Sequence, residues 1–250
     1  MYQFNNEKKE ITFDRYNTPT PWMNYLSNGT FHTMMSQAGG GVAFYKSPQI
    51  WRINHYRFFH LPTDRSGFYT FIKDTDEYWC PTNEPCKTKP EEWKSTHGMG
   101  YTRFEAKRNG VAVTATYFVG KFENALLWNL KIKSDVDKKI SIFPYVELGM
   151  MEFMRELQWQ CYNKHQLSVY AMDDILVYKY GVEMQPKPDE TPLVYFATDA
   201  KISGYDCDRD EFVGSYRSEE NPQRVEEGNC SNSTLYGGDP CFAFKIDLDL

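Results

Sequence analysis

The stretch "YTRFEAKRNGVAVTATYFV" (101–119) decides the fold class, because it contains two strand-like segments joined by a tight turn. Apolar and polar residues alternate before "RNG" (108–110), and the alternation resumes from Val111 to Tyr117. A period of two residues is typical of a strand with one buried face. Asn-Gly tolerates the positive φ angles of a two-residue primed turn, so the stretch predicts an antiparallel hairpin.

The same short apolar alternation recurs along the rest of the chain. Further strands are predicted at 41–46, 67–73, 124–134, 139–150, 165–171, 174–184, 192–199 and 241–250. Two connections separate some of them, the polar turn "SDVDKK" (134–139) and the proline-rich "QPKPDETP" (185–192). About a dozen antiparallel strands with polar turns are typical of a large β-sandwich, so the predicted fold class is all-β.

Little helix is predicted. The segment "ELGMMEFMRELQWQ" (147–160) is the only one that suits a helix, but its apolar residues are nearly continuous and Gly149 disfavours one. We interpret it as a strand end followed by a loop from Glu152 to Gln166. The stretches 78–100 and 204–233 are predicted to be long ordered loops, which in compact domains usually serve function or packing.

Length and composition favour one β domain. A chain of 250 residues fits one large β domain or two ordinary ones, and a single domain over residues 1–250 is the simpler expectation. Aromatic residues make up 16% of the chain, with 18 Tyr, 17 Phe and 6 Trp. Aromatic side chains are enriched in strands, and their planar rings also stack on sugars. The composition therefore indicates β structure and is compatible with a carbohydrate ligand.

Charge and cysteine content exclude several classes of protein. The formal net charge is −6 at pH 7 and no basic stripe is present, which argues against a nucleic-acid or anionic-membrane surface. No run of about 18 apolar residues occurs, and "MYQFNNEKKEI" has no signal-peptide pattern, so a cytoplasmic protein is expected. The six cysteines lack paired C-x-x-C spacing, which predicts free thiols and no metal site.

No catalytic group stands out among the remaining motifs. The triple glycine in "SQAGGGVAFY" (36–45) leads into a strand and lacks a Gly-Lys-Ser/Thr ending, so we predict a turn where backbones approach closely rather than a phosphate loop. The carboxylates of "DTDE" (74–77) and "DRDEF" (208–212) are expected to face water or cap turns, and His97 to be structural. His165 and Gln166 offer several hydrogen-bonding groups for sugar hydroxyls, although the residues alone favour an ordinary loop pair.

Nine stretches together carry a family resemblance. In chain order they are "TPTPWMNYLSNG", "GGGVAFYKSP", "INHYRF", "LPTDRSGFYTFIKD", "YWCPT", "HGMGYTRFEAKRNGVAVTATYFV", "SIFPYVEL", "YDCDRDEFVGSYRSEENPQRVEEGNCSNS" and "GGDPCFAFKIDLDL". With them the chain resembles the disaccharide phosphorylases of glycoside hydrolase family 94, which include cellobiose, chitobiose and laminaribiose phosphorylases. The resemblance covers nearly the whole chain in matching order.

The resemblance implies a fold and a reaction. The fold is a large antiparallel super-β-sandwich, similar to galactose mutarotase, at the N-terminus of the enzyme. The reaction is an inverting phosphorolysis in which inorganic phosphate, a co-substrate, converts a β-linked disaccharide into an α-sugar 1-phosphate and a free sugar, without a cofactor. A general-acid Asp protonates the leaving oxygen from an (α/α)6 barrel, which is expected downstream of residue 250. No catalytic residue is therefore expected within 1–250.

The resemblance also implies a role for the domain itself, in homodimer contact and in loops that wall the sugar site, including that of the partner subunit. The loop after "SIFPYVEL" carries a Gln that matches Gln166, so Gln166, with His165, is the predicted sugar contact. Cellobiose-cleaving members follow this Gln with Arg, whereas Leu167 stands here and "HQLSVY" is closer to chitobiose-cleaving members. Leu167 therefore argues against cellobiose and does not by itself define another acceptor.

Two other functions fit the residues. The chain acting alone could be a carbohydrate-binding sandwich, which suits its aromatic content and its lack of catalytic groups. It could also be purely structural, in which case the isolated chain would expose a large apolar patch.

Overall fold

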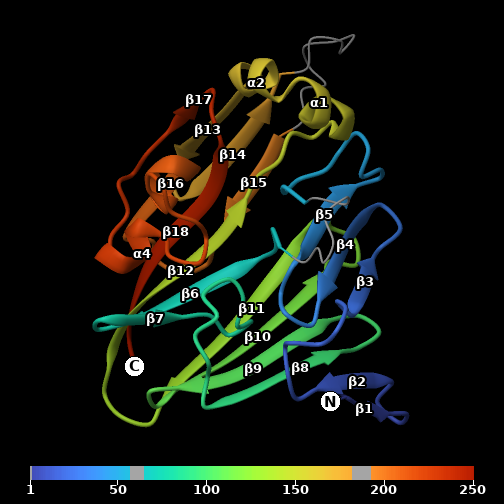
Figure 1. Ribbon diagram of the computed structural model, residues 1–250, viewed down its shortest axis with the longest axis vertical. Helices are drawn as coiled ribbons and strands as arrows, with labels where there is room; N and C mark the ends of the chain where they lie inside the picture. The colour runs from blue at the N-terminus through green and yellow to red at the C-terminus, as the bar shows by residue number, and fades with distance from the viewer. Residues whose placement is uncertain (1, 57–64, 182–192) are drawn as a thin grey trace.

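The computed structural model describes residues 2–56, 65–181 and 193–250 (Figure 1). Within these ranges the chain forms four sheets whose neighbouring strands all run antiparallel. The predicted proline-rich connection at 185–192 lies outside the described residues. No helix in the described ranges is long and apolar enough to cross a membrane.

Two sheets are large. The six-stranded sheet contains, in spatial order, β1 (Tyr2–Asn5), β2 (Glu10–Phe13), β8 (Glu92–His97), β9 (Thr102–Arg108), β10 (Val111–Val119) and β11 (Leu126–Ser134). The five-stranded sheet contains β16 (Gly204–Asp208), β18 (Pro240–Asp249), β12 (Lys139–Glu147), β6 (Tyr69–Asp74) and β7 (Glu77–Trp79). The long strand β11 forms one edge of the six-stranded sheet.

Two smaller sheets complete the structure. The four-stranded sheet contains β15 (Leu193–Ala197), β14 (Ile175–Tyr180), β13 (Leu167–Met172) and β17 (Leu235–Tyr236). The three-stranded sheet contains β3 (Met23–Ser27), β4 (Phe31–Ser36) and β5 (Gly41–Tyr45). Figure 1 shows the four-stranded sheet at the end of the molecule opposite β8 and β9, and the three-stranded sheet at the side between these ends.

The predicted hairpin is confirmed. Arg108 at the end of β9 lies opposite Val111 at the start of β10, so only two residues form the turn. These are Asn109, with a φ of 51°, and Gly110, with a φ of 77°. Two positive φ angles in succession define the primed turn that the Asn-Gly pair favours.

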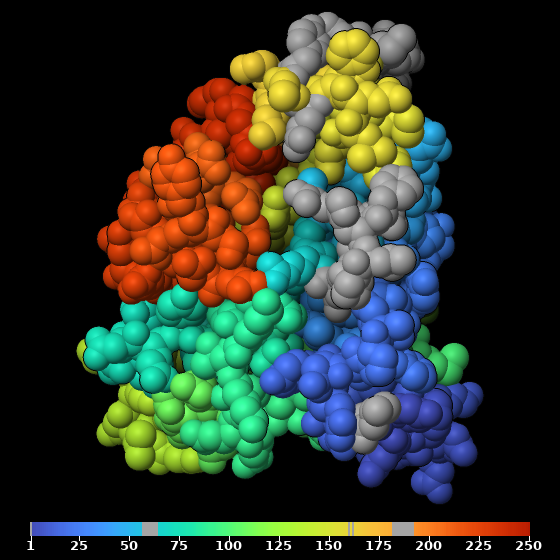
Figure 2. Space-filling model, in the orientation of Figure 1, coloured from blue at the N-terminus to red at the C-terminus, as the bar shows by residue number. Residues whose placement is uncertain are grey.

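The five-stranded sheet is the middle layer of the sandwich. One face packs on the six-stranded sheet through buried side chains such as Ile142 and Val113. On the other face Tyr145 stacks on Phe212 of α3 (Arg209–Val213), with ring centroids 4.9 Å apart. Figure 2 shows the orange segment around α3 and α4 resting beside the teal segment around β6 and β7. The prediction of an all-β sandwich is therefore confirmed.

One core joins all four sheets. It contains Phe104 from the six-stranded sheet, Phe242 from the five-stranded sheet, Val169 from the four-stranded sheet and Phe31 from the three-stranded sheet, all buried. Such a contiguous apolar core holds the sheets in fixed relative positions.

The interpretation of 147–160 as a strand end and loop is confirmed up to Glu152 and is wrong from Phe153. The chain after β12 forms α1 (Phe153–Gln158), α2 (Gln160–Asn163) and a 3₁₀ turn, η1 (Lys164–Gln166). Gly149 lies before α1 and not within it, and a Cβ atom there would come within 3.1 Å of the His55 backbone. The glycine therefore permits close packing and does not interrupt a helix.

The two predicted long loops also contain regular structure, so those predictions are wrong as well. The stretch 204–233 holds β16, α3 and α4 (Gln223–Glu227), and the stretch 78–100 holds β8. The sequence of β8, "EWKSTH", lacks apolar alternation, but the strand is held on both sides by β2 and β9. Pairing with neighbours decides such strands more than local propensity does.

The predicted close approach at the triple glycine is confirmed. A Cβ atom on Gly41 would lie 1.9 Å from the Met34 carbonyl oxygen, and one on Gly67 would lie 2.0 Å from the Gly39 carbonyl oxygen. Only glycine leaves room for two backbones at these distances.

His97 has the structural role that the sequence predicts. Its Nε2 lies 2.9 Å from the Trp22 carbonyl oxygen and its Nδ1 lies 3.2 Å from Thr102 Oγ1. Burial lowers the pKa of His97 to about 4, so the ring is neutral at physiological pH. The six cysteines are free thiols, as predicted.

Candidate functional site

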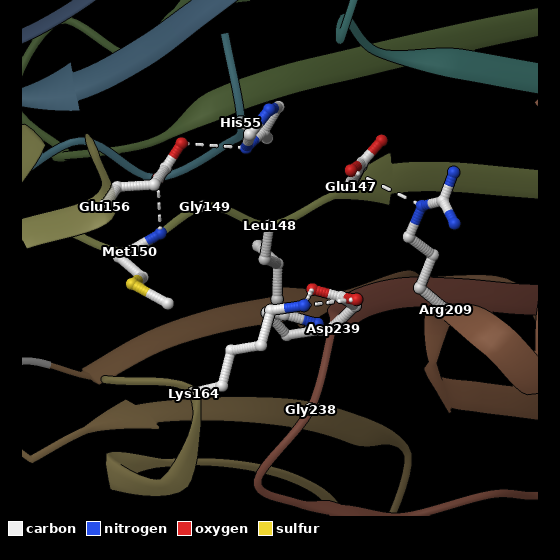
Figure 3. A pocket seen from close by; sticks show the side chains of 11 residues that line it. His55, Glu147, Leu148, Gly149, Met150, Glu156, Lys164, Arg209, Gly238 and Asp239 are labelled. Atoms are coloured by element: carbon white, nitrogen blue, oxygen red, sulfur yellow. Dashed lines mark hydrogen bonds and ion pairs between the residues drawn. The ribbon is translucent and has the colours of Figure 1, made fainter. Parts of the chain in front are cut away.

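A pocket of about 220 Å³ lies where β12 ends and β18 begins (Figure 3). Several elements meet there, including the segment before α1, η1 and α3. Its lining residues are His55, Glu147, Leu148, Gly149, Met150, Glu156, Lys164, Arg209, Gly238, Asp239 and Pro240. Six of them carry ionisable side chains, which is a large share for a site surrounded by a sandwich core.

Glu156 is the centre of one buried charge cluster. Its carboxylate lies 2.6 Å from Arg52 Nη2 and 2.8 Å from His55 Nδ1, and it accepts the backbone N–H of Met150 at 2.8 Å. Burial opposes ionisation, but the hydrogen bond from His55 and the charge of Arg52 outweigh it, and the pKa of Glu156 is lowered. For His55, burial is likewise outweighed by the bond to Glu156, and its pKa is raised.

A second cluster involves two carboxylates and one guanidinium. Arg209 Nε lies 3.4 Å from Glu147 Oε1, and Arg209 Nη2 pairs with Glu219. Burial, followed by the charge of Glu219, raises the pKa of Glu147 to about 7. Glu147 therefore takes up a proton near neutral pH, whereas the pKa of Glu219 is lowered, since its bonds to Glu147 and Arg209 outweigh its burial.

A third group of contacts, an ion pair and a backbone hydrogen bond, lies on the side of the pocket formed by η1. Lys164 Nζ lies 2.6 Å from Asp239 Oδ1, and the Gly238 N–H donates to the Lys164 carbonyl oxygen at 3.2 Å. These three groups of contacts tie η1, α1, α3 and the start of β18 to the end of β12. The charges of the pocket are thus engaged with one another, which suits a rigid support for the surrounding loops.

The structure places the two predicted sugar contacts beside this pocket but not in its lining. His165 and Gln166 both belong to η1, next to Lys164. His165 is exposed, whereas Gln166 is partly buried. The Gln166 side-chain oxygen is buried and has no hydrogen-bond partner among the described residues, although its backbone oxygen accepts the Gly181 N–H at 2.7 Å.

The sequence analysis did not identify the pocket carboxylates as site residues. Glu147 and Glu156 lie within an apolar stretch, and a charge in such a stretch is a signal of burial that could have found them. The acidic motifs behave in two ways. Asp208 caps α3 as expected, by accepting the Asp210 N–H at 2.9 Å. The expectation is wrong for Asp74, which is buried and pairs with Lys138. Among the residues with defined placement, no three His, Cys, Asp or Glu side chains come together to hold a metal ion.

Comparison with known proteins identifies the class to which this sandwich belongs. The model of the family described as "Glycosyl hydrolase 94, supersandwich domain" matches residues 7–250, and the chain belongs to this family. The predicted resemblance is therefore confirmed.

Several relatives are disaccharide phosphorylases. The chain is 34% identical to N,N'-diacetylchitobiose phosphorylase of Vibrio proteolyticus and 33% identical to that of Vibrio furnissii, in both cases over 92% of this chain and 29% of the relative. It is 27% identical to solabiose phosphorylase of Paenibacillus borealis, over 92% of this chain and 30% of the relative. The chain thus spans about three tenths of the length of these three relatives.

Proposed function

We propose that residues 1–250 form the sandwich domain of an inverting disaccharide phosphorylase, in which inorganic phosphate cleaves a β-linked disaccharide to an α-sugar 1-phosphate and a free sugar. The family match over residues 7–250 carries this proposal. The chain spans about three tenths of the length of the chitobiose and solabiose phosphorylases, which fits a role in supporting a site whose reacting groups lie in another part of the enzyme.

The identities to the relatives support an N-acetylated disaccharide as the first substrate to test. The two chitobiose phosphorylases are 34% and 33% identical to this chain, against 27% for the solabiose phosphorylase. Leu167, directly after Gln166, agrees with this choice.

Within the enzyme, the domain contributes Gln166 and His165 to a sugar site, in a homodimer across the subunit boundary. The buried amide oxygen of Gln166, which has no hydrogen-bond partner among the described residues, supports this role, because such an oxygen is costly unless a ligand or neighbouring chain donates to it. Near η1, the side chains of Met154, Leu157 and Trp159 are 46%, 54% and 64% exposed, which supports a contact surface there. The six free thiols support a reducing compartment such as the cytoplasm.

The test uses the full-length enzyme that contains this chain. It is incubated with phosphate and, in separate reactions, N,N'-diacetylchitobiose, cellobiose and laminaribiose, and the release of sugar 1-phosphate is measured. We expect release from N,N'-diacetylchitobiose above all. Hydrolysis without sugar 1-phosphate, or no reaction with any β-disaccharide, would contradict the proposal. Binding of these sugars to residues 1–250 alone, measured by calorimetry, would favour the carbohydrate-binding alternative.

A further inference from the structure

Two thiols face each other in the turn that follows β7. Cys80 and Cys86 bracket "CPTNEPC" (80–86), and their sulfur atoms lie 3.3 Å apart. Cys80 is fully buried in the core under α3 and α4, whereas Cys86 is half-buried and packs against that core from outside. One sulfur is therefore shielded and its neighbour can be reached from solvent.

The backbone of the turn holds the two thiols in this position. The Asn83 N–H donates to the Cys80 carbonyl oxygen at 3.1 Å, and the Lys87 N–H donates to the Asn83 carbonyl oxygen at 2.8 Å. Pro81 and Pro85 restrict the chain between these bonds. The chain folds back on itself, so the thiols meet without any movement of β7.

We propose that Cys80 and Cys86 form a redox-sensitive pair that a hydroperoxide converts reversibly into an intramolecular disulfide. The two sulfur atoms must approach by little more than 1 Å to reach the bonding distance of about 2.05 Å. The other four cysteines have no sulfur contact of this kind among the described residues, so the chemistry is specific to this turn.

The reaction has two steps with defined roles. The Cys86 thiolate attacks one oxygen of the hydroperoxide, the O–O bond breaks, and Cys86 becomes a sulfenic acid as hydroxide or alkoxide leaves and takes up a proton. The Cys80 sulfur then attacks the sulfenic sulfur, the S–S bond forms, the S–O bond breaks, and the departing hydroxide takes the Cys80 proton as water. The two thiols lose two electrons and two protons, and the peroxide is reduced.

Accessibility and acidity agree on which cysteine reacts first. Burial raises the pKa of Cys80, so it stays a thiol and serves in the second step. The disulfide closes a ring around 80–86 and fixes the turn next to Lys87, whose Nζ lies 2.6 Å from Glu220 in the segment that carries α4. The turn 80–86 is therefore stiffer in the disulfide state than in the dithiol state, and a thiol reductant restores the dithiol state.

The sequence makes the test direct, because trypsin releases both cysteines in one peptide, 74–87. The reduced full-length protein is treated with hydrogen peroxide, denatured, alkylated and digested, and the peptide is weighed. We expect a peptide that lacks both alkyl groups and two hydrogens, and that regains two alkylatable thiols after dithiothreitol. Two alkyl groups on this peptide, at a peroxide level that oxidises the exposed Cys161, would overturn the proposal, as would irreversible sulfinic acid.

Three variants separate the roles. In Cys86→Ser, the buried Cys80 is expected to remain reduced and to alkylate after denaturation. In Cys80→Ser, a sulfenic acid on Cys86 is expected to accumulate and to react with dimedone. The control Cys161→Ser removes an exposed thiol in α2 and is expected to leave formation of the disulfide unchanged. If Cys80 in Cys86→Ser is oxidised as fast as in the parent, the pairing is refuted even if Cys80→Ser does not fold.

Discussion

Glu156 stabilises the pocket because its carboxylate neutralises a buried guanidinium. Arg52, its partner at 2.6 Å, is fully buried. In Glu156→Gln the guanidinium would lack its counter-ion, and we expect the free energy of unfolding to fall by about 3 kcal/mol, as for other broken buried pairs. Urea unfolding at pH 7 measures this change.

The matched control for Glu156 is an exposed ion pair. Lys139 and Asp249 lie 3.6 Å apart with side chains 89% and 83% exposed. Asp249→Asn is expected to leave the free energy of unfolding unchanged, because water screens such pairs. An equal loss in Asp249→Asn and Glu156→Gln would show that burial of the charge is not the cause.

Gln166 is expected to matter for activity and not for folding. In Gln166→Ala of the full-length enzyme a sugar hydroxyl loses its partner, which costs about 1–3 kcal/mol in the transition state, or roughly ten- to a hundredfold in kcat/KM. The melting temperature should change little, since the amide oxygen has no hydrogen-bond partner within the described chain. Steady-state kinetics and thermal unfolding check both statements. Unchanged kinetics would show that Gln166 does not contact the sugar. A large fall in melting temperature would show that Gln166 has a structural role.

For single residues, the sequence predicted roles that depend on residue type and nearby residues, and it missed contacts between residues far apart in the chain. The structural role of His97 and the cap at Asp208 follow from local chemistry and could be predicted. The pairing of Arg52 with Glu156 joins residues about a hundred positions apart, and no local pattern reports such a contact. His165 and Gln166 were found through the family resemblance, and their contact with sugar remains a prediction.

At the scale of the element, the turn between β9 and β10 allows a clean test of backbone strain. Gly110 has a φ of 77°, and a Cβ atom there would meet nothing within 4 Å. Gly110→Ala therefore introduces strain without a clash, and we expect a loss of about 1–2 kcal/mol in the free energy of unfolding. Equilibrium unfolding in urea measures it.

Gly100 provides the matched control for the turn. A Cβ atom at Gly100 also meets nothing within 4 Å, but the residue does not have a φ in the left-handed region. Gly100→Ala should be neutral or slightly stabilising, because alanine restricts the unfolded chain. If the two variants were equally stable, the strain attributed to the turn would be absent.

Elements with a strong pattern were predictable, and elements defined by their neighbours were not. Alternation located β10 and β11, because each of these strands buries one face. Strand β12 lies in the middle layer and is buried on both faces over residues 142–146, and its run of apolar residues located it. Strand β8 lacks the pattern and exists through pairing with β2 and β9. The helices α1 to α4 are only four to six residues long, too short to show a helical period.

At the scale of the whole molecule, the pocket makes stability depend on pH. The folded-state pKa of Glu147, about 7, lies above its usual value of 4.5, so the native state holds a proton that the unfolded chain has lost. This contribution is fully present below pH 4.5 and is lost as the pH rises to about 7. The raised pKa of His55 acts in the same direction, since its contribution is lost above its usual value of 6.5. The lowered pKa of Glu156 acts only in acid, where stability is lost as the pH falls below 4.5.

Between pH 5 and pH 7 Glu147 lowers the free energy of unfolding by on the order of 2 kcal/mol. His97, which is buried with a pKa of about 4, raises the free energy of unfolding by a similar amount over the same range, because its ring is neutral in the native state and protonated in the unfolded chain. Glu147→Gln should therefore gain stability relative to the parent as the pH rises from 5 to 7, whereas Asp249→Asn should retain the slope of the parent. Urea unfolding at several pH values provides the profile. A Glu147→Gln variant whose pH dependence equals that of the parent would contradict the assignment.

Strand β11 has a consequence for handling the protein at high concentration. It is nine residues long and forms an edge of its sheet, so the backbone groups on its outer side pair with no strand of the described chain and could pair with the edge strand of another molecule. Lys131 and Lys133 are exposed along this strand, and their positive charges would repel the same strand of a second molecule. These two lysines therefore oppose aggregation through this edge. Chemical acetylation would neutralise them and should shorten the time for which a concentrated solution stays clear.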